Sequence, residues 1–304
     1  MLTITRDQWH GVFPAITTPF DEDGQVDHDF LAAHARRLVA AGCRAIVPLG
    51  SLGEGATLYY EEKVEVIRTL ANAVGDRVPV IAGIAALSTD EAVALSIAAM
   101  NAGCGGLMVL PPYVYPGDWH EIRAHVEAVI TETSLPCMLY NNPIAYGFDF
   151  LPEHVRTLSV HENLHAVKDS SGDVRRITAM RALLGDRLAL FVGLDDAVVE
   201  GVAAGATGWV AGLVNALPEE SVLLFEHARA GRTAEARALY DWFLPLLRLD
   251  TVPKFVQLIK LVQAECGLGG ERVRPPRLAL EGAEREMAMA VIGRQLAERP
   301  GPER

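Results

Sequence analysis

Lys168 is the residue of this sequence whose position best suits covalent chemistry. It comes directly after the short apolar run His165–Val167 and directly before Asp169. Burial disfavours the charged form of a lysine, and a neutral amine attacks a carbonyl carbon to give an iminium, which is an electron sink. Lys168 is therefore a candidate nucleophile for a carbonyl or imine substrate. Two structural interpretations stay open, a solvated strand end and an ion pair with Asp169.

Tyr140 ends another apolar run, Pro136–Tyr140, and is followed by Asn141-Asn142-Pro143. If this run and the one before Lys168 are neighbouring strands, the two side chains lie on the same rim. A phenol beside an iminium can carry protons to and from the adjacent carbon. A packing tyrosine with a bonded hydroxyl is the alternative, but the pair is more informative than either residue alone.

A glycine-rich segment, Gly50–Gly55, follows the run Ala45–Leu49. Around Ser51 it would expose main-chain N–H groups just before a helix, which suits a substrate carboxylate. Glu54 is then either a residue that orients the loop or an ordinary acid at a helix start. A plain strand-to-helix turn explains the same glycines.

Three further segments follow later apolar runs. Gly193-Leu194-Asp195-Asp196 and Val210-Ala211-Gly212 suit a close approach of the main chain to a small ligand. Tyr113 and Tyr115 follow the run Gly106–Leu110, where they would line a pocket or form a subunit contact.

The elements that must position these residues recur along the chain. Short runs that are apolar on both faces alternate with segments of helical periodicity such as Asp29–Ala41, which is typical of parallel strands covered by helices. Eight such units predict an α/β fold, a (β/α)8 TIM barrel, with its site at the C-terminal ends of the strands. A doubly wound sheet is the alternative, although no GxGxxG follows the first run. The runs are Val12–Thr17, Ala45–Leu49, Val78–Ile84, Gly106–Leu110, Pro136–Tyr140, His165–Lys168, Leu188–Gly193 and Gly208–Gly212.

The strands stop after about residue 218. Helical segments then follow over Glu219–Ala230, Thr233–Leu247, Val252–Cys266 and Glu281–Glu298. We therefore predict a barrel over residues 1–218 and a helical extension over residues 219–304, packed on the barrel without a linker.

Composition excludes several classes of partner. The chain has 304 residues and a formal net charge of -12 with no basic block, so neither nucleic acid nor an anionic membrane is an expected partner. No apolar run approaches the roughly 18 residues that span a bilayer, and the first residues lack a signal core, so we expect a cytoplasmic protein.

The four cysteines lack CxxC spacing and suit buried free thiols. There is no HxxxH and no His/Cys cluster, so we expect no metal and no cofactor.

Together these segments resemble the dihydrodipicolinate synthase / N-acetylneuraminate lyase family of class I Schiff-base barrels. The resemblance runs from Gly11–Phe20 to the C-terminal helices, and it rests on Gly50–Glu54, Tyr140–Pro143, Val167–Gly172 and Gly193–Asp195. It implies a small-molecule 2-oxo acid or cyclic imine as substrate and a homotetramer as the assembly.

The resemblance also implies roles for single residues. Lys168 would be the Schiff-base lysine and Tyr140 the tyrosine that relays protons. Ser51 and nearby N–H groups, with Leu52 beside them, would hold the substrate carboxylate. Gly193 and Val210 would line the pocket near the lysine.

Three departures from the family pattern bear on the substrate. Leu52 stands where a second hydroxyl residue is usual, and Ala145 stands where synthase members have an arginine for a second carboxylate. Val114 stands where they place a relay tyrosine from a neighbouring subunit, and Tyr115 lies one residue further along. The 4-hydroxy-tetrahydrodipicolinate synthase reaction is therefore the least expected enzymatic activity.

The segments Tyr140–Gly147, Asp173–Thr178 and Leu249–Thr251 are most similar to 1-pyrroline-4-hydroxy-2-carboxylate deaminases. We therefore expect dehydration and deamination of that cyclic imine to 2-oxoglutarate semialdehyde and ammonia. The alternatives are a pyruvate-dependent aldolase, a dehydratase of 2-oxo-3-deoxy sugar acids, and a barrel that binds a metabolite without catalysis.

Overall fold

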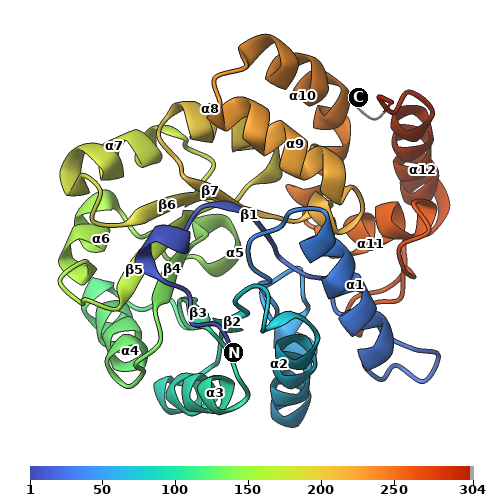
Figure 1. Ribbon diagram of the computed structural model, residues 1–304. Helices are drawn as coiled ribbons and strands as arrows, with labels where there is room; N and C mark the ends of the chain where they lie inside the picture. The colour runs from blue at the N-terminus through green and yellow to red at the C-terminus, as the bar shows by residue number, and fades with distance from the viewer. Residues whose placement is uncertain (302–304) are drawn as a thin grey trace.

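The sheet at the centre of the molecule is parallel throughout. The structure is a computed structural model that describes residues 1–301. Its strands pair in the order β1-β7-β6-β5-β4-β3-β2 and curl into a barrel surrounded by helices (Figure 1). Nearly all strand residues are buried, as expected of strands covered by helices. The strands are β1 (Gly11–Pro14), β2 (Ile81–Ile84), β3 (Gly106–Val109), β4 (Cys137–Asn141), β5 (Leu164–Asp169), β6 (Ala189–Val192) and β7 (Gly208–Ala211).

The prediction of a continuous strand over Ala45–Leu49 is wrong. This segment forms isolated parallel bridges, through Val47 to the residue after β1 and through Ile46 to the residue before β2. It still closes the barrel, because the Val47 N–H donates to a β1 carbonyl at 2.8 Å and the Pro48 carbonyl accepts from a β2 N–H at 2.9 Å. Pro48 has no N–H and Leu49 has a φ of 66°, so the extended conformation ends there. The predicted (β/α)8 barrel is confirmed, with its second strand reduced to bridges.

The helices around the sheet begin where the sequence supplies a side-chain acceptor. Asp27, Ser88 and Asp118 each accept a hydrogen bond from the main-chain N–H three residues later, which satisfies a free donor of the first turn. The surrounding helices are α1 (His28–Ala40), α2 (Tyr60–Val74), α3 (Thr89–Asn101), α4 (Trp119–Thr131), α6 (Pro152–Leu158), α7 (Arg175–Leu184), α8 (Val198–Ala203) and α9 (Pro218–Arg229).

Three more helices complete the chain, α10 (Thr233–Leu247), α11 (Phe255–Glu265) and α12 (Gly282–Ala297). Helix α11 is an internal element, since every residue from Val256 to Val262 is buried. The α10–α12 group lies along one side of the barrel (Figure 1). The four predicted helical segments are therefore present, while the division of the chain at residue 218 stays a prediction; residues 302–304 of the predicted extension lie outside the described part.

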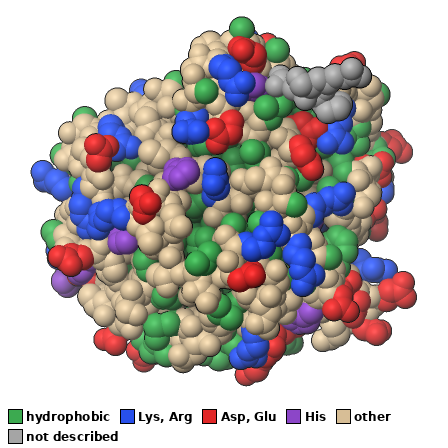
Figure 2. Space-filling model, in the orientation of Figure 1, with side chains coloured by type: hydrophobic (Ala, Val, Ile, Leu, Met, Phe, Trp, Pro, Cys, Tyr) green, Lys and Arg blue, Asp and Glu red, His purple; other side chains and the backbone are tan. Residues whose placement is uncertain are grey.

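The outer surface carries both signs of charge. Figure 2 shows Lys and Arg side chains interspersed with Asp and Glu side chains over one face of the molecule. Within residues 1–301 no helix is long and apolar enough to cross a bilayer. The cysteines are free, and burial raises the pKa of Cys43, Cys104 and Cys137 to about 12, whereas Cys266 is only half-buried.

A buried histidine makes the stability of this fold depend on pH. The His34 ring lies 3.2 Å from the Asn215 side-chain oxygen, and burial lowers the pKa of His34 to about 4. The folded state disfavours protonation of His34. The stabilisation that the neutral ring contributes to folding is therefore complete above the unfolded pKa of about 6.5 and is lost as the pH falls toward 4. We expect the free energy of unfolding to fall by about 2 kcal/mol between pH 7.5 and pH 5 on this account.

Urea unfolding of His34→Gln checks this prediction. The variant should be less stable at pH 7.5 but lose less stability on acidification than the parent. His120→Gln is the matched control, because His120 is exposed. An equal acid sensitivity of His34→Gln and the parent would contradict the assignment.

Candidate active site

Lys168 and Tyr140 lie side by side at the C-terminal end of the barrel. They are register partners on β5 and β4, and their side chains are 6% and 4% exposed. The Lys168 Nζ lies 4.1 Å from the centroid of the Tyr140 ring. Among the described residues this amine has no hydrogen-bond or ion-pair partner, so its end is available to a ligand.

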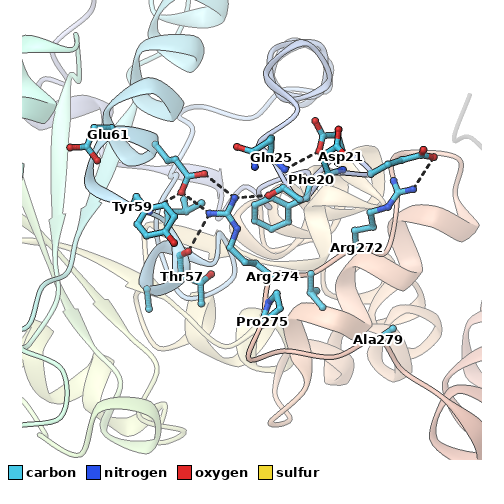
Figure 3. A pocket seen from close by; sticks show the side chains of 17 residues that line it. Phe20, Asp21, Gln25, Thr57, Tyr59, Glu61, Arg272, Arg274, Pro275 and Ala279 are labelled. Atoms are coloured by element: carbon cyan, nitrogen blue, oxygen red, sulfur yellow. Dashed lines mark hydrogen bonds and ion pairs between the residues drawn. The ribbon is translucent and has the colours of Figure 1, made fainter.

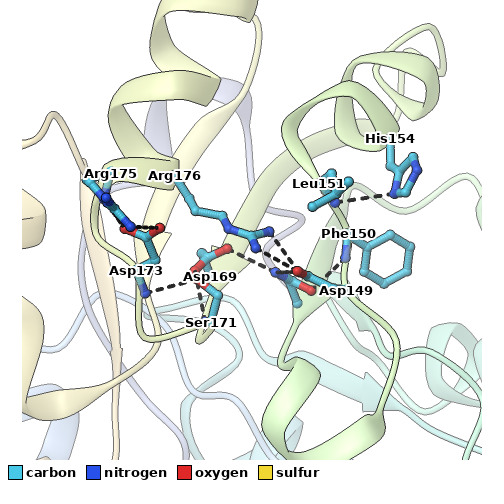
Figure 4. A network of polar contacts seen from close by, with 10 residues as sticks. Asp149, Phe150, Leu151, His154, Asp169, Ser171, Asp173, Arg175 and Arg176 are labelled. Atoms are coloured by element: carbon cyan, nitrogen blue, oxygen red, sulfur yellow. Dashed lines mark hydrogen bonds and ion pairs between the residues drawn. The ribbon is translucent and has the colours of Figure 1, made fainter.

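Asp169 does not pair with Lys168. Successive side chains of a strand point to opposite faces, and the Asp169 carboxylate accepts hydrogen bonds from the Asn141 amide at 3.0 Å and the Ser171 main-chain N–H at 2.9 Å. Figure 4 shows this network, in which Asp149 bonds to Arg176 through both oxygens at 2.7 and 2.6 Å. The interpretation of Lys168 as a structural ion-pair partner of Asp169 is therefore wrong.

A glycine makes room for the lysine on the next strand end. A Cβ atom on Gly193 would lie 2.7 Å from the Lys168 Cε and 2.0 Å from the Ser170 Oγ. Real Cβ atoms do not approach so closely, so any larger residue would displace the lysine stem. The position of Gly193 beside Lys168 agrees with the sequence analysis.

The Gly50–Gly55 loop presents unbonded donors to the same space. Within the described chain the N–H groups of Ser51 and Leu52 have no acceptor, and both residues line the cavity around Lys168. The helix expected directly after the loop is absent, because α2 begins only at Tyr60. A single 3-10 turn, Gly55–Thr57, follows instead, so a helix N-terminus does not contribute to this part of the site.

Glu54 holds this loop against the C-terminal helices. Its side chain is fully buried, and its Oε1 lies 2.6 Å from the Nζ of Lys260 on α11. Its Oε2 accepts from the Arg274 N–H at 3.0 Å. The Arg274 side chain binds Glu62 at 2.6 Å, and Figure 3 shows it beside the Phe20 ring. Glu54 is therefore an anchor of the loop rather than an ordinary acid at a helix start.

The cavity over Lys168 has a volume of about 350 Å³. All six residues singled out from the sequence, Lys168, Tyr140, Ser51, Leu52, Gly193 and Val210, line it. The structure thus brings them together in one site. Leu194, Gly212 and Ala145 also line the cavity, as the sequence analysis expected. Residues that it did not place there include Met108, Asn142, Ile144 and the segment 250–253 with Phe255.

A second tyrosine lies beside this cavity. The hydroxyl groups of Tyr146 and Ser51 are hydrogen-bonded, and the Tyr146 ring packs 5.7 Å from the Tyr140 ring and 5.3 Å from the Tyr113 ring. Burial raises the pKa of Tyr146 well above its usual value, so it holds its proton. The Asn142 amide donates to the Tyr140 oxygen at 3.0 Å. The sequence signal for Tyr146 was its place four residues after Asn142, within the short helix α5 (Pro143–Tyr146).

Tyr115 does not replace the missing relay tyrosine in its own chain. Its hydroxyl donates to Glu121 at 2.8 Å, and neighbouring Val114 is 90% exposed with a φ of 71°. Ala145, by contrast, does line the cavity, where its methyl group offers no charge. In the part of the chain that the structure describes, no group of three or more His, Cys, Asp or Glu residues could hold a metal ion.

The arrangement is that of a barrel enzyme, in which polar side chains from several strand ends converge on one cavity. Residues 8–295 match the family described as the Dihydrodipicolinate synthetase family. The chain belongs to this family and is a lyase of it.

Individual relatives agree with this assignment. A 4-hydroxy-tetrahydrodipicolinate synthase of Natronomonas pharaonis is 37% identical over 78% of this chain and 80% of its own length. The solved dihydrodipicolinate synthase of Bacillus anthracis has a TM-score of 0.90 at 29% identity, covering 96% of this chain and 99% of that one. A prophage protein of the dihydrodipicolinic acid synthase family from E. coli K12, solved in complex with pyruvate, has a TM-score of 0.88 at 28% identity, covering 94% and 98%.

Proposed function

We propose that Lys168 forms a Schiff base with a small monocarboxylate, and that the reaction is dehydration and deamination of 1-pyrroline-4-hydroxy-2-carboxylate. The observation that carries this proposal is the charge of the cavity wall. Among the described residues that line it, Lys168 is the one cation and Asp250 the one acid. A substrate with two carboxylates would find no second cation, because Ala145 occupies the position of the synthase arginine.

Lys168 and the residues around it each have a chemical role in this proposal. The free amine adds to C2 of the cyclic imine, and the ring C2–N bond then breaks so that the ring nitrogen becomes a primary amine on C5. The resulting iminium on Lys168 acidifies the hydrogens on C3. Tyr140 lies against the amine and accepts a hydrogen bond from Asn142, which leaves its own proton free to be exchanged with the substrate. In this scheme Tyr140 first gives its proton to the ring nitrogen that leaves C2, and its phenolate, or a water molecule that it positions, then removes a proton from C3.

The substrate carboxylate has donors on the same side of the barrel. The unbonded N–H groups of Ser51 and Leu52 suit an anion, because oriented main-chain donors bind carboxylates without a full charge. The side chain of Leu52 is buried and adds apolar surface rather than a second hydroxyl. A compact ring with one carboxylate fits this combination.

A pyruvate-dependent aldolase of the same family is the second candidate. The lysine chemistry is the same up to the enamine, and the E. coli K12 relative was solved in complex with pyruvate. A dehydratase of 2-oxo-3-deoxy sugar acids would use the same steps on an open-chain substrate.

A substrate panel tests the proposal. Purified protein is given 1-pyrroline-4-hydroxy-2-carboxylate, several 3-deoxy-2-oxo acids and 4-hydroxy-2-oxo acids, and ammonia and pyruvate release are measured. We expect ammonia release from the hydroxypyrroline with a kcat/KM at least about tenfold above that of any other compound in the panel. Such a ratio corresponds to about 1.4 kcal/mol or more of additional transition-state stabilisation. Pyruvate release from a 4-hydroxy-2-oxo acid as the main activity would identify an aldolase, and synthase activity would contradict the proposal.

We also propose a homo-oligomer, a tetramer by the family resemblance. Leu87, Val114 and Tyr115 are large exposed apolar side chains on neighbouring loops, which are joined by a hydrogen bond from the Tyr113 N–H to the Ala86 carbonyl at 3.4 Å. Apolar side chains gathered on one surface favour a protein contact.

A further inference from the structure

An acidic residue in the cavity has no partner for one of its oxygen atoms. Asp250 ends the 3-10 turn η5 (Arg248–Asp250), which joins α10 to α11, and it lines the cavity over Lys168. Its Oδ1 is buried and makes no hydrogen bond to any described residue. An unpaired buried carboxyl oxygen is costly, so its retention at a reaction site calls for a chemical explanation.

The Asp250 carboxyl group occupies the space that a side chain at Gly212 would fill. A Cβ atom on Gly212 would lie 2.2 Å from the Asp250 Oδ1 and 2.5 Å from its carboxyl carbon. The carboxyl group therefore rests directly on the main chain that follows β7, where any side chain would exclude it. This contact ties the extension to a strand end of the barrel.

Asp195 is hydrogen-bonded to the N–H donors that lie nearest to Asp250. Its carboxylate accepts from the N–H groups of Gly212 and Leu213, at 3.0 and 2.7 Å, and from the Trp209 ring at 3.0 Å. Asp250 therefore lies near a second buried acid, Asp195, on the other side of Gly212, and the N–H groups there are already bonded to Asp195.

The electrostatic surroundings favour the protonated form of Asp250. Burial raises its pKa well above the usual value, the charge of Asp195 adds to this effect, and Lys168 opposes it while Asp196 reinforces it. Burial also raises the pKa of Asp195 to about 6, although its donors act in the opposite direction. Two buried acids beside each other do not both ionise readily, and the one with fewer donors keeps the proton.

We propose that Asp250 is the acid that protonates the hydroxyl group leaving C4 of the substrate. This inference rests on the proposed function, because it assigns the protons of that reaction. Asp250 would then be a catalytic residue that the family motifs at the strand ends do not include.

The elimination step balances as follows. In the enamine on Lys168, the C2=C3 pair of electrons moves to form C3=C4 while the C4–O bond breaks and its electrons leave with oxygen. The Asp250 proton passes to that oxygen, which departs as water, and an iminium re-forms at C2. The Asp250 carboxylate then regains its proton from solvent. A proton moves from C5 to C3, which converts C3=C4 into a C4=C5 enamine; C4 takes a proton, and water hydrolyses the resulting C5 imine to an aldehyde with release of ammonia. Water also adds to C2, and the C2–N bond to Lys168 breaks to give the 2-oxo acid and the free amine.

The other polar groups of the cavity have different tasks. Lys168 is covalently bound during elimination, and Tyr140 is the proposed group for the C3 proton. The Thr251 hydroxyl donates to the Arg248 carbonyl at 3.0 Å and is occupied. Asp250 is the acid among the described residues that line this cavity, which suits it to supply a proton to a leaving oxygen.

Asp250→Asn tests the inference, because it keeps the size of the side chain and removes the acid. We expect ammonia release from 1-pyrroline-4-hydroxy-2-carboxylate to fall by about 10² to 10⁴-fold in kcat, the usual contribution of general acid–base catalysis, with KM within about threefold. Borohydride trapping of pyruvate, and exchange of its methyl hydrogens with deuterium from solvent, precede the elimination and should stay within about threefold.

Asp241→Asn is the matched control, because Asp241 lies on α10 of the same extension, is exposed and does not line the cavity. It should retain ammonia release within about threefold, and thermal unfolding shows whether both variants are folded. The inference is overturned if Asp250→Asn releases ammonia normally, or if deuterium exchange falls as far as ammonia release, which indicates a structural role. Failure of the proposed function looks different, since the wild-type protein itself would then release no ammonia.

Discussion

Lys168→Ala should lose turnover by roughly 10⁴-fold or more, because the residue that would carry the covalent intermediate is gone and only binding by the cavity remains. The variant should also lose all adduct formation when it is treated with borohydride and pyruvate. The chain has four lysines, so mass spectrometry of the reduced protein assigns the adduct to one of them without ambiguity.

The matched control for this experiment is Lys63→Ala. Lys63 lies on α2 and does not line the cavity, so its variant should keep both turnover and the adduct. An adduct on another lysine, or turnover by Lys168→Ala, would reject the Schiff-base mechanism. Alanine removes the amine without adding bulk, and the neighbouring Gly193 therefore keeps its conformation.

Glu54→Gln should produce the largest loss of stability among single substitutions near the site. Lys260 would keep its charge but lose the carboxylate 2.6 Å away, in a place where its side chain is 2% exposed. Removing one partner of a buried ion pair costs about 3–5 kcal/mol, out of a total folding stability of about 5–15 kcal/mol. Urea unfolding monitored by circular dichroism measures the change.

Two further variants show whether the unpaired charge is the cause. The double variant Glu54→Gln with Lys260→Met should regain part of the loss, because it leaves no buried charge behind. Glu284→Gln breaks the ion pair with Lys254, whose side chains are 44% and 49% exposed, and should change stability by less than about 1 kcal/mol. Equal effects of Glu54→Gln and Glu284→Gln would contradict this account.

The sequence predicted the barrel and the strand-end residues because both follow from local patterns. Lys168 and Tyr140 end apolar runs, and the rule that parallel strands place their C-terminal ends together is enough to make them neighbours. The strand that failed, over Ala45–Leu49, contains Pro48 and ends at a residue with positive φ. A single-sequence pattern of apolar residues does not reveal that conformation.

The residues that sequence reasoning missed come from far along the chain. Asp250 reaches the cavity because α10 and α11 fold back over the strand ends, and no spacing in the sequence relates it to Lys168. Its contact with Gly212 and the competition from Asp195 exist only after the chain has packed. Tyr146 was missed for a related reason, since its hydrogen bond to Ser51 depends on where the short helix α5 directs it.

The Glu54–Lys260 contact has a consequence for how this chain matures as it is synthesised. The last strand of the barrel, β7, ends at Ala211, yet the Gly50–Gly55 loop is anchored by Lys260 and Arg274, and Asp250 completes the cavity wall. A ribosome-bound chain that has released only its strands therefore has a lysine but no finished pocket. If Lys168 acts as proposed, its pocket is complete only after the final quarter of the protein has emerged and docked.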